Sequence, residues 1–198
     1  MKVIFRPITS SLNDILDNTL MKSTWQEYGE SYIKALEEVT GLKFKHSVIN
    51  IRCGKADHSH SGTIGKEAIQ IAVTGFSWIN KKSGSADRKP DIELLETLTH
   101  ELAHRLLAEH KILLPNSTPR ENYETHKYIY VFIYDAWLEA FGKIKAKQLA
   151  DVVSQNDMPD YKDAWRWAMK LNAKRRTELT KSLRPGKLLP EKVSKYLN

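Results

Sequence analysis

The sequence contains a single cysteine, Cys53, among 198 residues. One thiol excludes an internal disulfide framework and any metal site built from cysteines alone, and it is typical of a reducing compartment. The longest apolar run, YIYVFIY at 128–134, is far too short to cross a bilayer. The first residues contain no apolar stretch long enough for a secretory signal. We therefore expect a soluble, cytoplasmic protein that makes no use of a membrane.

Several common signatures are also missing, among them a glycine-rich phosphate loop, a Ser/His/Asp arrangement, internal repeats and low-complexity tracts. The hydrophobic content of 41% and the charged content of 28% are ordinary for a folded protein. The length suffices for one domain with a real core and a short extension. We expect the domain to cover residues 1–142 and the extension to cover residues 143–198.

Positive charge is concentrated in the last quarter of the chain. The net charge is +7, yet residues 143–198 contain 14 Lys/Arg and only 6 Asp/Glu, whereas the rest contains 17 and 18. A basic segment of this kind can bind nucleic acid or another polyanion. It can equally be the solvated face of exposed helices.

The first half of the chain predicts one long helix followed by short strands. Apolar residues recur at helical spacing over 12–40, beginning with Leu12, Ile15, Leu16 and Leu20, and Gly41 is a plausible stop. The partial alternation in LKFKHSVINI (42–51) and the apolar run in EAIQIAVTG (67–75) predict strands. Polar, turn-rich segments separate these strands from each other and from the next helix.

Two core helices and a helical basic end complete the expected α+β fold. The first helix starts at Pro90 and carries leucines on one face. The second starts at Thr118-Pro119, where Thr118 has capping-box spacing to Glu121, and it ends at Gly142. Because it is apolar on almost every side over 128–138, we expect it to be buried. One or two further helices are expected around 143–154 and 160–181.

The five letters HELAH in the first core helix carry the strongest chemical signal. His100 and His104 are four residues apart, so on a helix they project from one face, where both imidazoles can bind one Zn²⁺. Glu101 is angled aside from the first ligand and can act as general base toward the water that zinc acidifies. The alternative is a stretch of amphipathic helix that carries two exposed histidines.

A hydrolytic zinc site usually has a third protein ligand, and the second core helix offers two candidates. His126 shares its helical face with apolar and aromatic residues and should point inward, whereas Glu124 projects from nearly the opposite side. We expect His126 to be the ligand and keep Glu124 as the alternative. Asp135, an acid within the apolar stretch, can either orient a ligand histidine or pair with a nearby Lys or Arg.

With these residues, the stretch 90–142 resembles the zincin superfamily of metallopeptidases, and in particular the minimal intracellular SprT-like group. The resemblance implies that His100, His104 and His126 bind one Zn²⁺ per chain and that Glu101 is the general base. A glutamate replaces the third histidine in the gluzincins, which corresponds to Glu124 here. Metzincins do not match, because RLLAEH follows His104, and the tetracysteine ribbon that often follows SprT-like domains is missing.

The resemblance also implies a small sheet packed on the active-site helix and a second core helix. In zincins the strand before the active-site helix often aligns substrate along its free edge. The strand IQIAVT (69–74), with Ile69, Ile71 and Val73, is the corresponding segment. The expected function is a zinc metallopeptidase acting on polypeptides. The alternatives are a zinc hydrolase of a non-peptide substrate and a zincin-like module that binds nucleic acid or a partner.

Overall fold

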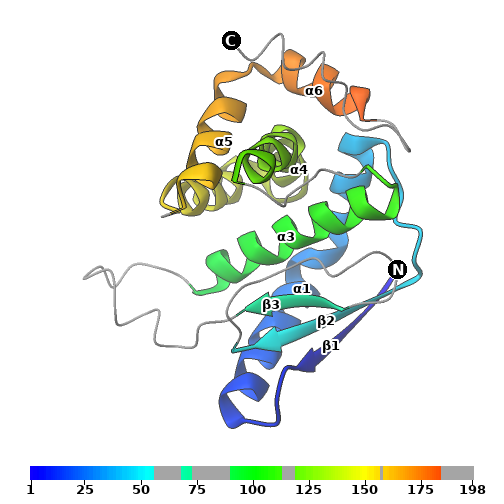
Figure 1. The fold of residues 1–198 in the computed structure, drawn as a ribbon. Coiled ribbons are helices and arrows are strands. Elements are labelled where there is room, and N and C mark those ends of the chain that lie inside the picture. Colours follow the sequence, from blue (N-terminus) through cyan, green and yellow to red (C-terminus); the bar gives the residue numbers. More distant parts are fainter. Residues whose placement is uncertain (56–67, 73–89, 113–118, 157, 184–198) are drawn as a thin grey trace.

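A computed structural model describes residues 1–55, 68–72, 90–112, 119–156 and 158–183. Over these residues it contains five helices and three strands, a mixture of α and β structure as expected (Figure 1). The elements are β1 (Lys2–Pro7), α1 (Leu12–Thr40), β2 (Val48–Gly54), β3 (Ile69–Ala72), α3 (Pro90–Glu109), α4 (Pro119–Ser154), α5 (Pro159–Lys170) and α6 (Ala173–Ser182).

The strands form one parallel sheet in the order β1-β2-β3. The alternation of β2 separates its two faces, because Ile49, Ile51 and Cys53 are buried whereas Val48 and Arg52 are exposed. Strand side chains point alternately to opposite faces, so only one face of β2 supplies apolar residues to the core.

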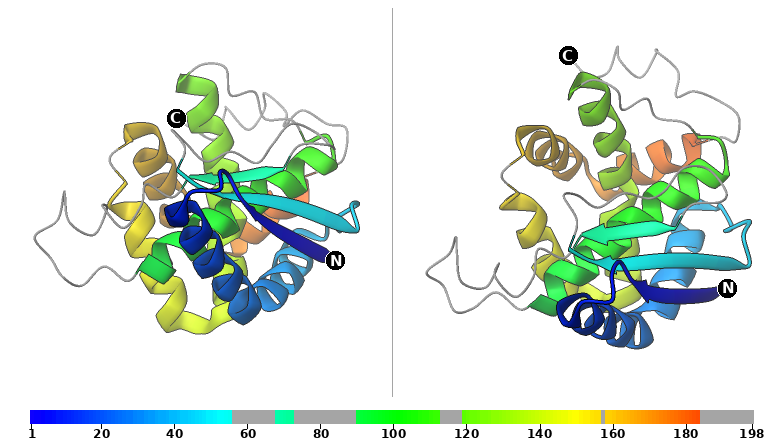
Figure 2. Two further views of the ribbon diagram at one scale, coloured as in Figure 1. Left: turned by 90° about the horizontal axis from the view of Figure 1, so that it is seen from below. Right: turned by 60° about the horizontal axis from the view of Figure 1, so that its bottom comes forward.

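The helices lie in layers on the buried face of this sheet (Figures 1 and 2). Helix α1 contacts β1 and β2, α3 contacts β3, and α4 packs across α1 and α3 on the side away from the sheet. The interior of α4 is as apolar as its sequence predicts, and Phe132 and Trp137 are fully buried. Burying side chains of this size contributes about 1.5–3 kcal/mol each to folding.

Helix α1 has the predicted bounds, but its first turns face the opposite way from the prediction. It ends at Gly41, which adopts a left-handed conformation with φ 69°. Leu12, Ile15 and Leu16 are exposed, however, whereas Asp14 is 2% exposed. The Asp14 carboxylate accepts hydrogen bonds from the backbone N–H of Thr9 (2.8 Å) and of Lys55 (3.0 Å). These bonds draw the acidic side of the helix against the sheet.

The strands agree only partly with the sequence analysis. β1 was not predicted. Residues 42–47 are not a strand: side chains accept from most of their backbone N–H groups, and the Ser47 carbonyl accepts from Lys2 N of β1. The Glu109 carboxylate accepts from Lys45 N (2.7 Å), and Glu37 accepts from Phe44 N (3.0 Å). The predicted strand at 67–75 is present as β3, while Val73 and the residues after it lie outside the described residues.

The C-terminal half contains the predicted helices with one additional break. Gly142, with φ 74° and ψ 172°, interrupts the helical conformation of α4 where a helix end was expected. The predicted helix over 160–181 is two helices, because the Asn172 side chain accepts from Arg175 N (2.9 Å) and caps α6. Thr118 and its expected capping box lie outside the described residues.

Helices α5 and α6 both contact α4, and α6 also contacts α1. The domain boundary at residue 142 stays a prediction, but the helices beyond it pack against the same core. Within the part of the chain that is described, no helix is long and apolar enough to span a bilayer.

Candidate metal centre

His100 and His104 direct their imidazoles to one point beside α3. Their Nε2 atoms lie 3.1 Å apart, and their ring centroids lie 4.8 Å apart. Two imidazole nitrogens this close share either a proton or a cation. Bond lengths of about 2.0–2.1 Å in a tetrahedral zinc site would place two nitrogens about 3.3 Å apart, so the observed spacing fits a common metal ion.

His126 of α4 joins this pair across the helix–helix interface. Its ring centroid lies 5.1 Å from that of His100 and 5.2 Å from that of His104. One nitrogen from each of the three rings lies within 4.8 Å of the others. The two histidines of one helix and the third from the next therefore form a compact group of three nitrogen donors, which we call the histidine cluster.

Glu124 is not part of this cluster. Its carboxylate, 37% exposed, lies 3.3 Å from the ammonium of Lys127. The Lys127 side chain is buried between the rings of Tyr123 and Trp167, at 4.6 Å and 4.7 Å from their centroids. As predicted, His126 points inward from α4 and Glu124 projects away from it. The partner of Glu124 is Lys127.

Two hydrogen bonds to Thr99 hold α3 in place next to His100. Tyr32 of α1 donates its hydroxyl proton to the Thr99 carbonyl (2.8 Å), and the Trp137 indole of α4 donates to the Thr99 hydroxyl (2.9 Å). Both donors are fully buried. Since α1 and α4 fix the residue that precedes His100, the position of the cluster is set by packing as well as by helical spacing.

Burial keeps His100 and His104 neutral. It lowers the pKa of His104 to about 3, with a further contribution from the charge of His126. Burial likewise lowers the pKa of His100, assisted by the charges of His104 and His126. Metal binding requires neutral imidazole, so these two histidines are donors at pH 7 that need not lose a proton first.

Two buried carboxyl groups lie on α3 beside the cluster. Burial, together with a smaller contribution from the charge of Glu96, raises the pKa of Glu101 to about 8. Burial also raises the pKa of Glu96 to about 8, with a contribution from Glu93. A divalent cation on the histidine nitrogens would favour the ionised form of both groups, because a nearby positive charge lowers a carboxyl pKa. Only the ionised form of Glu101 can accept a proton.

The aromatic surroundings of the cluster were only partly expected from the sequence. The Tyr161 ring of α5 lies 3.8 Å, centroid to centroid, from His126 and 6.0 Å from His100. Tyr130 of α4 lies 5.6 Å from His100. Tyr130 shares a helical face with His126 and could be found by periodicity, but nothing in the sequence relates Tyr161 to a histidine 35 positions earlier.

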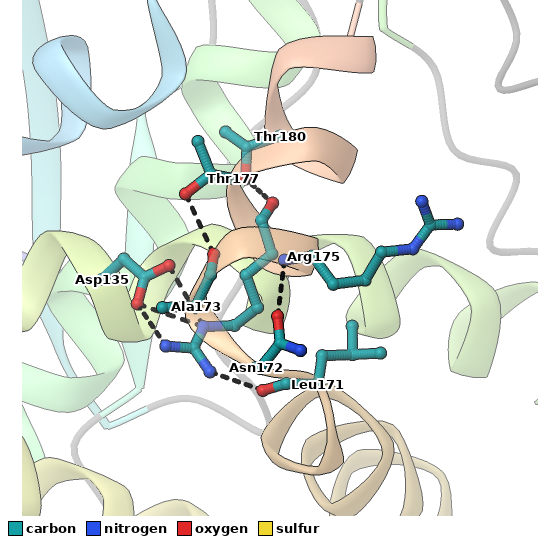
Figure 3. Close-up of polar contacts among 8 residues, drawn as sticks. Asp135, Leu171, Asn172, Ala173, Arg175, Thr177 and Thr180 are labelled. Atoms are coloured by element: carbon teal, nitrogen blue, oxygen red, sulfur yellow. Dashed lines mark hydrogen bonds and ion pairs between the residues drawn. The ribbon is translucent and has the colours of Figure 1, made fainter.

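Asp135 does not orient a histidine; it pairs with an arginine. The guanidinium of Arg176 in α6 donates hydrogen bonds to both oxygens of the Asp135 carboxylate. The shortest of these is 2.7 Å, from Nη2 to Oδ1 (Figure 3). The same guanidinium donates to the Leu171 carbonyl at 2.8 Å. Asp135 therefore pairs with an arginine, which was one of the two roles considered for it. This pair connects α6 to α4.

Strand β3 lies next to α3 and, among the described strands, pairs only with β2. The side chains of Ile69 and Ile71 are fully buried. They belong to the core, so a bound peptide would meet the backbone of this edge rather than these two side chains. The third residue predicted for this edge, Val73, lies outside the described residues.

Comparison with known proteins identifies no relative. No family model, no curated protein and no solved structure matches this chain.

Proposed function

We propose that this protein is a zinc-dependent metallopeptidase of zincin-like architecture, in which His100, His104 and His126 bind one Zn²⁺ and Glu101 is the general base. The observation that carries the proposal is the convergence of one nitrogen from each histidine within 4.8 Å. The donor set fits zinc, because three neutral imidazoles leave a fourth tetrahedral position for water, as in catalytic zinc sites.

Each protein group has a definite task in this proposal. Bound zinc supplies a Lewis acid that polarises a carbonyl and lowers the pKa of a coordinated water. Glu101, on the turn of α3 that carries the ligands, accepts a proton from the attacking water and passes it to the leaving amine. The apolar walls around the cluster, including Tyr130 and Tyr161, exclude bulk water and strengthen electrostatic interactions within it.

We favour a polypeptide substrate because β3, the last strand in the order of the described sheet, contacts the helix that carries His100 and His104. β3 contacts α3 and has β2 as its neighbour among the described strands, and an extended peptide bound alongside β3 would pair with it through backbone hydrogen bonds. Backbone pairing is tolerant of side-chain identity and suits a peptide-bond hydrolase more than an enzyme for small amides. The resemblance of residues 90–142 to zincins supports the same reaction class.

Metal analysis of four proteins tests the proposal. We expect the wild type to contain about one zinc per chain. His126→Ala should lose it, whereas Glu101→Gln should retain zinc and lose at least about 100-fold in hydrolysis of a denatured protein, measured by mass spectrometry of new termini. His110→Ala is the matched control, because His110 lies at the end of α3 and bonds to the Lys43 carbonyl instead of the cluster.

The outcomes separate the alternatives. A wild type that contains no zinc when supplied with it contradicts the whole proposal. Zinc with cleavage of a nucleic acid or small amide, but not of protein, would favour the non-peptide hydrolase. Zinc with no hydrolysis of any of these substrates would favour a binding module.

A further inference from the structure

The two ring nitrogens of His100 have different surroundings. Nε2 faces the cluster, 3.1 Å from Nε2 of His104. Nδ1 is buried on the other side and has no hydrogen-bond partner in the described structure. If Nε2 presents its lone pair to a metal, the ring must carry its proton on Nδ1. This N–H then needs an acceptor, because a buried donor without one is unfavourable.

A carboxylate lies one helical turn before this nitrogen. Glu96 Oε1 is 3.8 Å from His100 Nδ1, and both side chains are mostly buried. That distance is too long for a hydrogen bond, which spans about 2.7–3.2 Å. The two residues are four apart on α3 and share a face, so a small rotation of the Glu96 side chain suffices to close the gap.

The backbone that joins the two residues is held in place. The Thr99 hydroxyl donates to the Glu96 carbonyl (2.9 Å) and accepts from the Trp137 indole (2.9 Å). Movement between Glu96 and His100 is therefore confined to side chains. Asp135, the acid first considered for such a role, is occupied by Arg176.

We propose that Glu96 is the positioning residue of His100: its carboxylate accepts a hydrogen bond from Nδ1–H and keeps the Nε2 lone pair directed at the metal. This inference rests on the proposed function, since it requires a metal at the histidine cluster. Metal-binding histidines generally donate their second ring N–H to a carboxylate or carbonyl, and loss of that partner typically weakens metal affinity 10- to 100-fold.

The test compares Glu96→Gln and Glu96→Ala with wild type, and Glu139→Gln serves as a matched control because Glu139 is an exposed glutamate of α4. Zinc affinity of the metal-free proteins is measured by competition with a chromophoric chelator. We expect Glu96→Gln to bind zinc about 10-fold more weakly and Glu96→Ala up to about 100-fold more weakly. The control should bind with wild-type affinity.

A second measurement responds to the hydrogen bond itself and not to general stability. In the zinc-loaded wild type, the His100 Nδ1–H proton should give a downfield resonance that is slow to exchange, because its acceptor is charged. The resonance should move upfield in Glu96→Gln. If Glu96→Ala does not fold, the near-isosteric Gln variant and the wild-type spectrum still decide the question.

The failures of the two proposals are distinguishable. A wild type that binds no zinc overturns both. A wild type that binds zinc, with Glu96→Gln at wild-type affinity and an unmoved resonance, overturns the role of Glu96 and leaves the zinc site intact.

Discussion

At the scale of single residues, the pairing of Asp135 with Arg176 makes a direct prediction about stability. Both side chains are largely buried, and the guanidinium donates hydrogen bonds to both carboxylate oxygens. Asp135→Asn removes one charge and leaves the other without its partner, so we expect the free energy of unfolding to fall by about 1–3 kcal/mol. Urea unfolding of the two proteins measures the difference.

Asp163→Asn is the matched control, because Asp163 pairs with Arg166 on the exposed face of α5. An exposed pair contributes little, so its loss should change stability by less than about 1 kcal/mol. Zinc content should be unaffected by Asp135→Asn. Loss of zinc at wild-type stability would instead support a ligand-orienting role for Asp135.

The residues of the candidate site differ in how far the sequence could predict them. His100, His104 and Glu101 follow from spacing within one helix, and the inward direction of His126 follows from its apolar face. The partner of Asp135 and the contact of Tyr161 with His126 could not be predicted, since both join residues of separate helices. Local periodicity specifies which face a residue occupies but not what packs against that face.

At the scale of elements, Glu109 joins the end of α3 to the segment before β2. Its carboxylate accepts from Lys45 N (2.7 Å) and Arg105 Nε (3.0 Å), and it lies 2.9 Å from His46 Nδ1. Burial raises the pKa of Glu109, but the hydrogen bonds from Lys45, His46 and Arg105 outweigh burial and lower it below its usual 4.5. The ionised carboxylate therefore stabilises the folded state.

The sign of the pH dependence follows from that lowered pKa. The stabilisation by Glu109 is fully present above about pH 4.5 and is lost as the pH falls through the folded-state pKa. We expect Glu109→Gln to lower the free energy of unfolding by about 2–4 kcal/mol at pH 7. The difference from wild type should shrink steadily below about pH 4.5, as measured by urea unfolding at several pH values.

Glu38→Gln, at an exposed position of α1, is the control and should differ little from wild type at any pH. A difference between Glu109→Gln and wild type that is constant from pH 7 to pH 3 would contradict the assignment. It would mean that the shape of the side chain, rather than its charge, holds residues 42–47.

The elements themselves show why long helices were predicted better than strands. α3 and the later turns of α1 have consistent apolar spacing; Gly41 marks the end of α1, and Gly142 marks the break within α4. β1 is short, and residues 42–47 alternate like a strand although Glu37 and Glu109 accept from the backbone N–H groups of residues 44–46. A strand depends on its neighbours, which a local pattern does not contain.

At the scale of the whole molecule, the described part of the basic C-terminal segment, up to residue 183, is packed against the core. The Trp165 side chain of α5 contacts the rings of Tyr130, Tyr134 and Trp137, and α5 also brings Tyr161 to the histidine cluster. Truncation after Gly142 would therefore damage the core and the candidate site together. Individual charges must be removed to test whether this segment binds nucleic acid.

Several basic side chains of this segment already have partners, including Arg176 with Asp135 and Arg175 with Glu178. Among the described residues of this segment, the exposed lysines include those at 143, 147, 170 and 174, which are candidates for phosphate contacts. If they bind duplex DNA, replacing all four with Gln should weaken binding and reduce the slope of log affinity against log salt by up to about 4. Fluorescence anisotropy over a range of salt concentrations measures both quantities.

The matched control replaces four exposed lysines elsewhere, at positions 2, 22, 34 and 111, and so changes the net charge equally. A contact localised to the C-terminal helices predicts that this control keeps nearly the wild-type slope. Equal losses in both variants would mean that only overall charge matters, because long-range attraction depends on net charge and not on a surface. If the wild type shows no measurable salt-dependent binding to DNA, these lysines are simply a solvated face of the helices. The proposed peptidase would then reach its substrate without the help of nucleic acid.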